Sequence, residues 1–324
     1  MSFYDALQPG SEIDSYRIEK VVARSGMASI YRAMDTRDNR IVALKIPHPD
    51  LEADPILFDR FRREAEIGQK LNHPMIMRVF EDESKSRVYM VMEWCDGRLL
   101  RQILSEGKIS HERAIRIAIN VLEGLTYIHA NGVIHRDLKP ENIMVGENDQ
   151  IKLIDFGIAG DSAAKRLTFT NITAALGTPD YISPEQVKGK RGDRRSDIYS
   201  LGVMLYEMLT GKTPFTGPSP LAVMNDRLIN FPIPPSVADP TISPELQEVL
   251  YRALERDPSH RYPNAQEFAH DLTHLDQVGV ANRLELTTWS KRKSQLSRKL
   301  VLYGGLAMIP VVLLVLMYLV AHWH

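Results

Sequence analysis

The chain has 324 residues, of which 44% are hydrophobic and 25% are charged, with 19 glycines and 19 prolines. This composition is typical of a folded protein and excludes a disordered or collagen-like chain. The single cysteine, Cys95, excludes an intramolecular disulfide framework and any metal cluster built from several cysteines. We therefore expect the folded part of the chain to lie in a reducing, cytosolic environment.

The balance of 40 basic and 41 acidic residues hides an asymmetry along the chain. Five bases lie within residues 291–299, and without them residues 1–290 carry 35 basic and 41 acidic side chains, a net charge of −6. A mildly acidic body lacks the basic surface that binds nucleic acids, so we expect no nucleic-acid partner.

The first part of the chain is expected to be rich in strands. Residues 1–15 form an N-terminal extension without the basic and apolar regions of a signal peptide. Apolar positions alternate at residues 29–33 and 41–46, which predicts strands of an antiparallel sheet, whereas residues 58–71 have helical spacing. Residues 16–95 are therefore expected to form a small β-rich lobe with one helix.

From about Leu99 onward, helical periodicity dominates. It predicts helices at residues 114–130, 197–209, 244–255 and 265–275. Residues 96–275 are therefore expected to form a larger, mainly helical lobe, and the fold class of the whole body is α+β.

The C-terminal part of the chain has the features of a membrane anchor. Residues 276–299 form a basic linker, and residues 300–320 contain no charge over a length that crosses a bilayer of about 30 Å as a helix. The positive-inside rule then places residues 1–299 on the cytoplasmic side and the short tail, residues 321–324, on the other. We expect a single-pass protein of the cytoplasmic membrane, with the basic linker available to anionic lipids.

Two short stretches carry the chemistry: His135-Arg136-Asp137-Leu138-Lys139-Pro140-Glu141-Asn142 and Asp155-Phe156-Gly157. They combine two carboxylates, an amide and an ammonium on loops between apolar runs. Such a set suits phosphoryl transfer, in which one carboxylate accepts a hydroxyl proton while other oxygen ligands hold Mg²⁺.

These stretches resemble the catalytic and metal-binding loops of eukaryotic-type protein kinases, and the resemblance extends over residues 16–275. It implies the two-lobed protein kinase fold, with ATP and Mg²⁺, or Mn²⁺ in its place, as cofactors. By position, Asp137 is the catalytic base, Lys139 contacts the γ-phosphate, and Asn142 and Asp155 are the metal ligands. Lys139, two residues after the base, resembles the serine/threonine kinases and not the tyrosine kinases.

The resemblance also assigns an ATP site to the small lobe. Lys45, in Val42-Ala43-Leu44-Lys45, is implied to hold the α- and β-phosphates, and Glu64 to form its ion pair. The further residues implied to contact the nucleotide are Val22, Ala23, Ser25, Gly26, Ile30, Ala43, Met92, Glu93 and Cys95.

The phosphate-covering loop departs from the family pattern, because Ala23, Ser25 and Ala28 occupy its three glycine positions. Small side chains still permit close approach of the backbone, but they lack the tolerance of glycine for positive φ. The neighbouring Gly26-Met27 pair resembles bacterial members of the family. The departure bears on ATP affinity and turnover.

The segment from Asp155 to Glu185 is the expected regulatory and substrate-docking segment. Thr170 and Thr173 are candidate phosphorylation sites, because a phosphate there could pair with Arg136. Thr178, in Gly177-Thr178-Pro179-Asp180-Tyr181, is implied to contact substrate.

Three further residues are implied to support the site. Glu185 is expected to pair with Arg261, and Asp197 to hold the backbone around Arg136. Their roles are structural, so substitutions there are expected to reduce activity by distorting the site.

The sequence predicts a kinase of protein serine and threonine residues, and it leaves two alternatives. The altered loop would also suit a pseudokinase that acts as a scaffold, and a small-molecule kinase could share the fold. The expected partners are protein substrates, with an opposing phosphatase and a homodimer formed through the membrane span as further partners.

Overall fold

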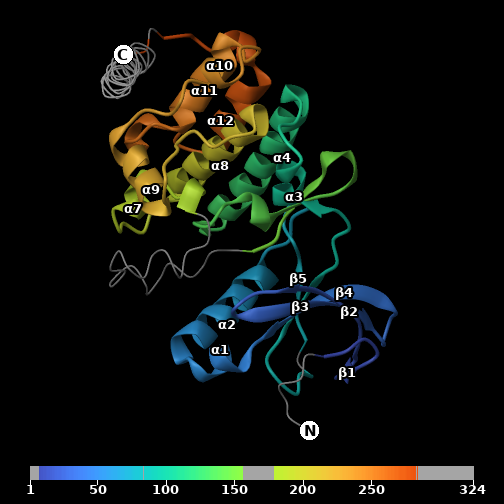
Figure 1. The fold of residues 1–324 in the computed structure, drawn as a ribbon. Coiled ribbons are helices and arrows are strands. Elements are labelled where there is room, and N and C mark those ends of the chain that lie inside the picture. The colour runs from blue at the N-terminus through green and yellow to red at the C-terminus, as the bar shows by residue number, and fades with distance from the viewer. Residues whose placement is uncertain (1–6, 83, 156–178, 282, 284–324) are drawn as a thin grey trace, which may run out of the picture. The chain divides into compact units, whose positions relative to one another are not determined.

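The computed structural model describes residues 7–82, 84–155, 179–281 and 283. The helices and strands it describes lie in one compact unit, residues 1–279, which contains a small and a large lobe (Figure 1). Residues 300–320 and the threonines at 170, 173 and 178 fall outside the described residues. Within the described ranges, no helix is both long enough and apolar enough to cross a bilayer.

An antiparallel sheet forms the small lobe, in the spatial order β1-β2-β3-β4-β6-β5. Its strands are β1 (Glu12–Ile13), β2 (Tyr16–Arg24), β3 (Ala28–Asp35), β4 (Arg40–Pro47), β5 (Val79–Phe80) and β6 (Met90–Glu93). Two helices follow β4 and lie beside the sheet in Figure 1: α1 (Pro49–Ala53) and α2 (Pro55–Lys70).

Helix α2 begins three residues before its predicted start because the chain supplies a cap there. The Asp54 carboxylate accepts hydrogen bonds from the backbone N–H groups of Ile56 and Leu57, at 2.9 and 3.2 Å. Pro55, which has no N–H to satisfy, occupies the first helical position. Phe61 packs in a cluster with Ala43 of β4. One turn further on, Glu64 therefore lies on the side of the helix that faces the sheet.

The large lobe is mainly helical, as predicted, and also contains a small sheet. Its longer helices are α3 (Leu100–Ser105), α4 (His111–Ala130), α8 (Arg194–Thr210), α9 (Pro220–Ile229), α11 (Pro244–Ala253) and α12 (Ala265–Thr273). The short elements are α7 (Pro184–Val187), α10 (Pro235–Ala238), η1 (Pro140–Asn142), η2 (Glu147–Asp149), η3 (Pro179–Tyr181), η4 (Pro258–His260) and η5 (Leu275–Gln277). The sheet has the order β7 (Arg98–Leu99), β8 (Ile143–Val145) and β9 (Ile151–Leu153).

Helix α8 is the centre of the large lobe, and every residue from Ser196 to Leu209 is buried. It packs between α4 and α11, which explains why apolar residues occur on all of its sides. The Asp193 carboxylate caps its start, and Gly211, with φ of 74°, ends it. Because α8 is buried from its first turn, it carries the carboxylate of Asp197 into the interior, directly beneath the loops that precede η1.

The predicted fold is confirmed at the level of the two lobes. The four predicted helices correspond to α4, α8, α11 and α12, and the two predicted strands to β3 and β4. The sheet of β7, β8 and β9 is an addition to the prediction. Its strands have two or three residues each, too few for a periodicity to be recognised.

We expect Gly97→Ala to destabilise the protein by about 2–4 kcal/mol. Gly97 joins β6 to β7 with φ of 153°, and an added Cβ would lie 2.4 Å from the Val145 carbonyl oxygen. The control is Gly26→Ala, because Gly26 has no positive φ and open space around its Cα. Thermal unfolding should show a midpoint below that of the wild type for Gly97→Ala alone. Equal midpoints for the two variants would contradict the requirement for glycine at position 97.

Candidate active site

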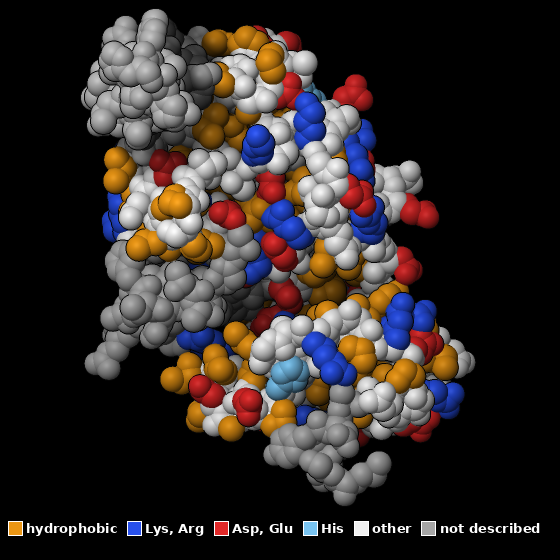
Figure 2. Space-filling model, viewed as in Figure 1, with side chains coloured by type: hydrophobic (Ala, Val, Ile, Leu, Met, Phe, Trp, Pro, Cys, Tyr) orange, Lys and Arg blue, Asp and Glu red, His pale blue; other side chains and the backbone are white. Residues whose placement is uncertain are grey.

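Three charged side chains from both lobes meet at the junction between them. Lys45 of β4 donates hydrogen bonds to Glu64 of α2, at 2.8 Å, and to Asp155, which follows β9, at 2.9 Å. The space-filling view shows acidic side chains gathered in the hollow between the lobes (Figure 2). A single ammonium group is thus shared by two carboxylates, which leaves the cluster with a surplus of negative charge.

The electrostatics of this cluster follow from its burial. Burial disfavours the charged form of Lys45, but the carboxylates of Asp155 and Glu64 outweigh it and raise the lysine pKa. The Glu64 pKa is also raised, because burial and the nearby Asp155 outweigh the attraction of Lys45. The two carboxylates compete for one ammonium, so the cluster is suited to binding a further cation.

Asp137 lies on the loop before η1 with its carboxylate accessible. Lys139 Nζ donates to its Oδ2 at 2.7 Å, and 41% of the Asp137 side chain is exposed. The Asn142 amide donates to the Asp137 backbone carbonyl at 2.8 Å, which fixes the loop around the carboxylate. The loop therefore presents an oriented carboxylate, next to an ammonium, to an incoming hydroxyl group.

The donor set at this site fits Mg²⁺. The Asn142 backbone carbonyl accepts a hydrogen bond from the Ile154 N–H at 3.0 Å, which places Asn142 close to Asp155. Because Nδ2 of Asn142 is engaged by Asp137, its amide oxygen is left available as a ligand. One carboxylate and one amide oxygen are hard ligands, and Mg²⁺ is commonly held by so few protein groups together with phosphates. Among the described residues, no group of three or more His, Cys, Asp or Glu side chains could hold a metal instead.

The backbone around Arg136 is held by Asp197 of α8. The Asp197 carboxylate accepts hydrogen bonds from the N–H groups of His135 and Arg136, at 3.0 and 2.8 Å. It also bonds the His129 imidazole at 2.8 Å. Arg136 has a φ of 63°, which is rare outside glycine, and the two bonds to Asp197 hold it there. The predicted contact of Asp197 is present, and it directs the chain so that Asp137 follows at the edge of the junction.

The strand β6 and the residues after it are the segment that the sequence predicts to contact the nucleotide. Met92 is buried and packs in one cluster with Ala43, Ile30 and Cys95. The Glu93 N–H donates to the Arg78 carbonyl at 2.9 Å, and the Glu93 carbonyl accepts from the Cys95 thiol at 3.9 Å. Ile154 packs against the same cluster and was missed by the sequence analysis, although its place directly before Asp155 was a usable signal.

The Cys95 thiol is poorly suited to react. Burial and the nearby Glu93 carboxylate raise its pKa to about 11. At neutral pH the reactive thiolate form of Cys95 is therefore scarce.

The loop between β2 and β3 forms a turn without the three family glycines. Ser25 donates from its N–H to the Ala28 carbonyl at 2.9 Å, and its hydroxyl oxygen accepts from the Ala28 N–H at 3.1 Å. Neither Ala23, Ser25 nor Ala28 has a positive φ. Val22, at the end of the hairpin, is partly exposed. The turn described here is thus stabilised by a serine side chain and does not require glycine geometry.

Glu185 of α7 and Arg261 form a buried ion pair. The two side chains meet through two hydrogen bonds of 2.8 and 2.7 Å, and Ser196 donates to the same carboxylate at 2.7 Å. Burial would raise the pKa of Glu185, but the bonds from Arg261 and Ser196 lower it below its usual value. This pair was expected from the sequence, and it joins α7 to the residue that follows η4.

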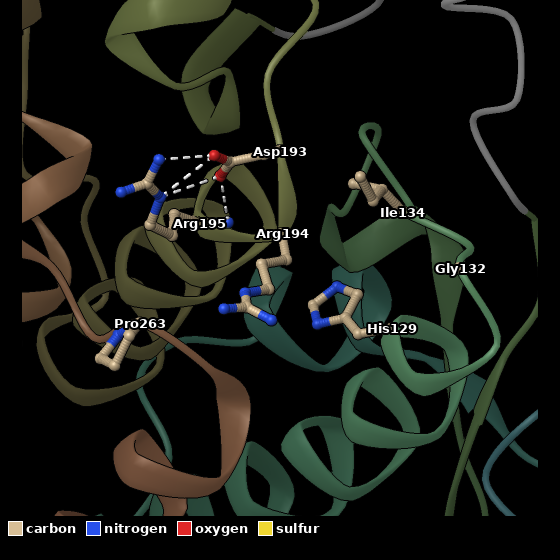
Figure 3. Close-up of a pocket in the computed structure, with 7 residues that line it drawn as sticks. All are labelled: His129, Gly132, Ile134, Asp193, Arg194, Arg195 and Pro263. Atoms are coloured by element: carbon tan, nitrogen blue, oxygen red, sulfur yellow. Dashed lines mark hydrogen bonds and ion pairs between the residues drawn. The ribbon is translucent and has the colours of Figure 1, made fainter.

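A cavity of about 460 Å³ lies between the end of α4, with the residues that follow it, and the start of α8 (Figure 3). Its lining includes His129, which holds Asp197, and the first residues of α8 with their Asp193 cap. None of its lining residues belongs to the Lys45 cluster.

Comparison with known proteins accounts for this geometry. The protein kinase domain family matches residues 16–273. The chain belongs to the protein kinase family. The kinase domain of PknI from Mycobacterium tuberculosis, a solved structure, matches with a TM-score of 0.65 and 26% identity over 83% of this chain and 100% of that one.

Two curated relatives are more similar in sequence. A probable serine/threonine-protein kinase of Streptomyces coelicolor is 44% identical over 263 residues, which are 79% of this chain and 39% of the relative. The serine/threonine-protein kinase PknB of Mycobacterium tuberculosis is 39% identical over 295 residues, which are 89% of this chain and 47% of the relative. The kinase described here therefore spans less than half the length of these relatives.

We expect Arg261→Met to destabilise this kinase by about 3–5 kcal/mol, because it leaves the Glu185 carboxylate buried without its cation. This loss of stability should become smaller as the pH falls from 7.5 to 5. In the wild type, the pKa of Glu185 lies below its value of about 4.3 in the unfolded chain, so the ion pair stabilises the fold at both pH values. In the variant, protonation of Glu185 as the pH falls relieves the cost of an unpaired buried charge. The control is Arg98→Met, since Arg98 and Glu106 are 51% and 64% exposed. Chemical unfolding at both pH values tests this, and equal losses for the two variants would contradict it.

Proposed function

We propose that this chain is a serine/threonine protein kinase that transfers the γ-phosphate of ATP to hydroxyl groups of proteins. The observation that carries the proposal is the shared Lys45 ammonium, bonded at once to Glu64 of the small lobe and Asp155 of the large lobe. This arrangement supports the proposal, because it would bring a phosphate-binding lysine and a metal ligand to the same point. The curated relatives are named serine/threonine-protein kinases, which supports the choice of substrate class.

The residues around Asp137 account for the chemical step. The substrate hydroxyl oxygen forms a bond to the γ-phosphorus while the bond to the β–γ bridging oxygen breaks. The hydroxyl proton passes to Asp137, whose carboxylate is accessible. Lys139 lies beside it and neutralises the negative charge that develops on the transferred group. Mg²⁺, when held by Asn142 and Asp155, supplies further positive charge to the phosphates.

Regulation by phosphorylation of Thr170 or Thr173 is part of the proposal. Arg136 supports it, because its Nε is buried and has no hydrogen-bond partner among the described residues. Burial and the neighbouring Arg191 lower the pKa of Arg136, as expected for cations held near each other. A phosphothreonine would bring about −1.5 to −2 charges to this site and relieve that repulsion.

Anchoring in the cytoplasmic membrane through residues 300–320 is the second part of the proposal. The uncharged length of this segment and the five bases before it support a single span with the kinase domain in the cytoplasm. The basic linker would contact anionic lipids, and the span would bring two copies together as a homodimer. An opposing phosphatase would reverse the reaction on protein substrates.

We expect the full chain, purified in detergent, to incorporate phosphate from ATP in the presence of Mg²⁺, on Thr170 or Thr173. Asp137→Ala should lose at least about a thousandfold in rate, since it removes the base and its charge. Mass spectrometry of the phosphorylated sites, with Asp149→Asn as a control carboxylate away from the cleft, measures this. ATP binding without transfer by the wild type would favour the pseudokinase scaffold instead.

We expect the full chain to stay in the membrane fraction after extraction at alkaline pH. A variant that ends at residue 290 should be released, because it lacks both the bases and the apolar segment. A second variant, in which the five bases are replaced by glutamine, should reverse or randomise the orientation of the chain in a protease-protection assay. Release of the full chain by the extraction would reject the anchor.

A further inference from the structure

Arg227 of α9 is buried almost completely, with 1% of its surface exposed. Its guanidinium carbon lies 5.9 Å from the ring centroid of Tyr199 and 5.7 Å from that of Phe215. A buried guanidinium is costly unless its N–H groups are satisfied. The partners of Arg227 in this apolar surrounding are backbone carbonyl groups, and they belong to one short segment.

That segment is Pro179–Ile182, which contains η3. Arg227 Nη1 donates to the Pro179 carbonyl at 2.9 Å and also to that of Ile182, while Nη2 donates to that of Asp180. The remaining carbonyl, that of Tyr181, accepts from the Ser200 hydroxyl at 2.7 Å. Four successive carbonyls are thus each bonded by a side chain of α8 or α9, and these side chains determine the path of the segment.

The other side of the segment is held through its tyrosine. The Tyr181 hydroxyl contacts Glu207 of α8, and Arg101 of α3 contacts the same hydroxyl and bonds Glu207 at 2.9 Å. With its backbone fixed by Arg227 and its side chain fixed by Glu207, the segment has little freedom left to change conformation.

We propose that Arg227 is a positioning residue for protein substrates, because it holds the segment 179–182 on which they dock. This inference rests on the proposed kinase function. The planar fork of a guanidinium is what allows one side chain to bond three carbonyls, and a lysine, with a single nitrogen, cannot reproduce it. Arg227→Lys therefore keeps the positive charge but removes the planar group that bonds the three carbonyls. The effect falls on protein substrate and not on ATP, since the Lys45 cluster is untouched.

The test measures KM for a general protein substrate such as casein and KM for ATP, with the full chain in detergent. Arg227→Lys should raise the protein KM at least tenfold and leave the ATP KM within twofold. The matched control is Arg252→Lys on α11, because Arg252 also lies over a ring, at 4.2 Å from the Tyr262 centroid, but is 39% exposed. It should change neither KM. An unchanged protein KM in Arg227→Lys, or an equal rise in both KM values, overturns the proposal.

Hydrogen–deuterium exchange separates this proposal from the kinase function. In Arg227→Lys, the peptide that covers residues 179–187 should exchange at least tenfold faster, while peptides from β4 and β6 are unchanged. If the wild type transfers no phosphate, faster exchange retains the role of Arg227 in holding the segment and rejects only the kinase function. Unchanged exchange overturns the proposal.

If thermal unfolding shows that Arg227→Lys does not fold, Ser200→Ala provides the test. It removes one hydroxyl that bonds the same segment, without changing a charge. The protein KM should then rise two- to fivefold with an unchanged ATP KM. An unchanged protein KM in Ser200→Ala overturns the proposal.

Discussion

The site depends first on one buried carboxylate, that of Asp197. Burial of a charge costs several kcal/mol unless it is fully hydrogen-bonded, and here the N–H groups of His135 and Arg136 and the imidazole of His129 meet that requirement. The bonds hold Arg136 at a positive φ that its side chain disfavours. The hydrogen bonds to the Asp197 carboxylate offset the energetic cost of this backbone conformation. The conformation of Arg136 in turn determines where Asp137 lies.

The second constraint is that Lys45 joins the two lobes. A cation on β4 is bonded to one carboxylate of α2 and to one carboxylate of the large lobe, so it links the two lobes at one point. Any movement of α2 therefore changes the partners of Lys45 and, with them, the charge offered to phosphates. The three-residue cluster forms only when Glu64 and Asp155 both lie within hydrogen-bond distance of the Lys45 ammonium. The geometry of the site therefore depends on the relative position of the lobes.

Two buried arginines hold the residues from Pro179 to α7 by different means. Arg261 forms two bonds to the Glu185 carboxylate, whereas Arg227 bonds carbonyl groups between aromatic rings. The planar guanidinium suits both situations, because several N–H groups point in fixed directions from one rigid group. Arg261 was predicted, since its partner stands in a recognisable motif. Arg227 was not, since carbonyl partners leave no trace in the side-chain sequence.

The sequence alone determined the two-lobed α+β fold and the long helices, because hydrophobic periodicity is a local property. From motif spacing it also predicted Lys45, Asp137 and Asp155 as residues of the site. It also indicated a departure at the phosphate-covering loop. Only the tertiary structure decided how that loop turns, through bonds of Ser25, and where the buried Arg227 finds its partners 45 to 48 positions away. These contacts join segments distant in sequence, and their hydrogen-bond geometry exists only once the helices have packed.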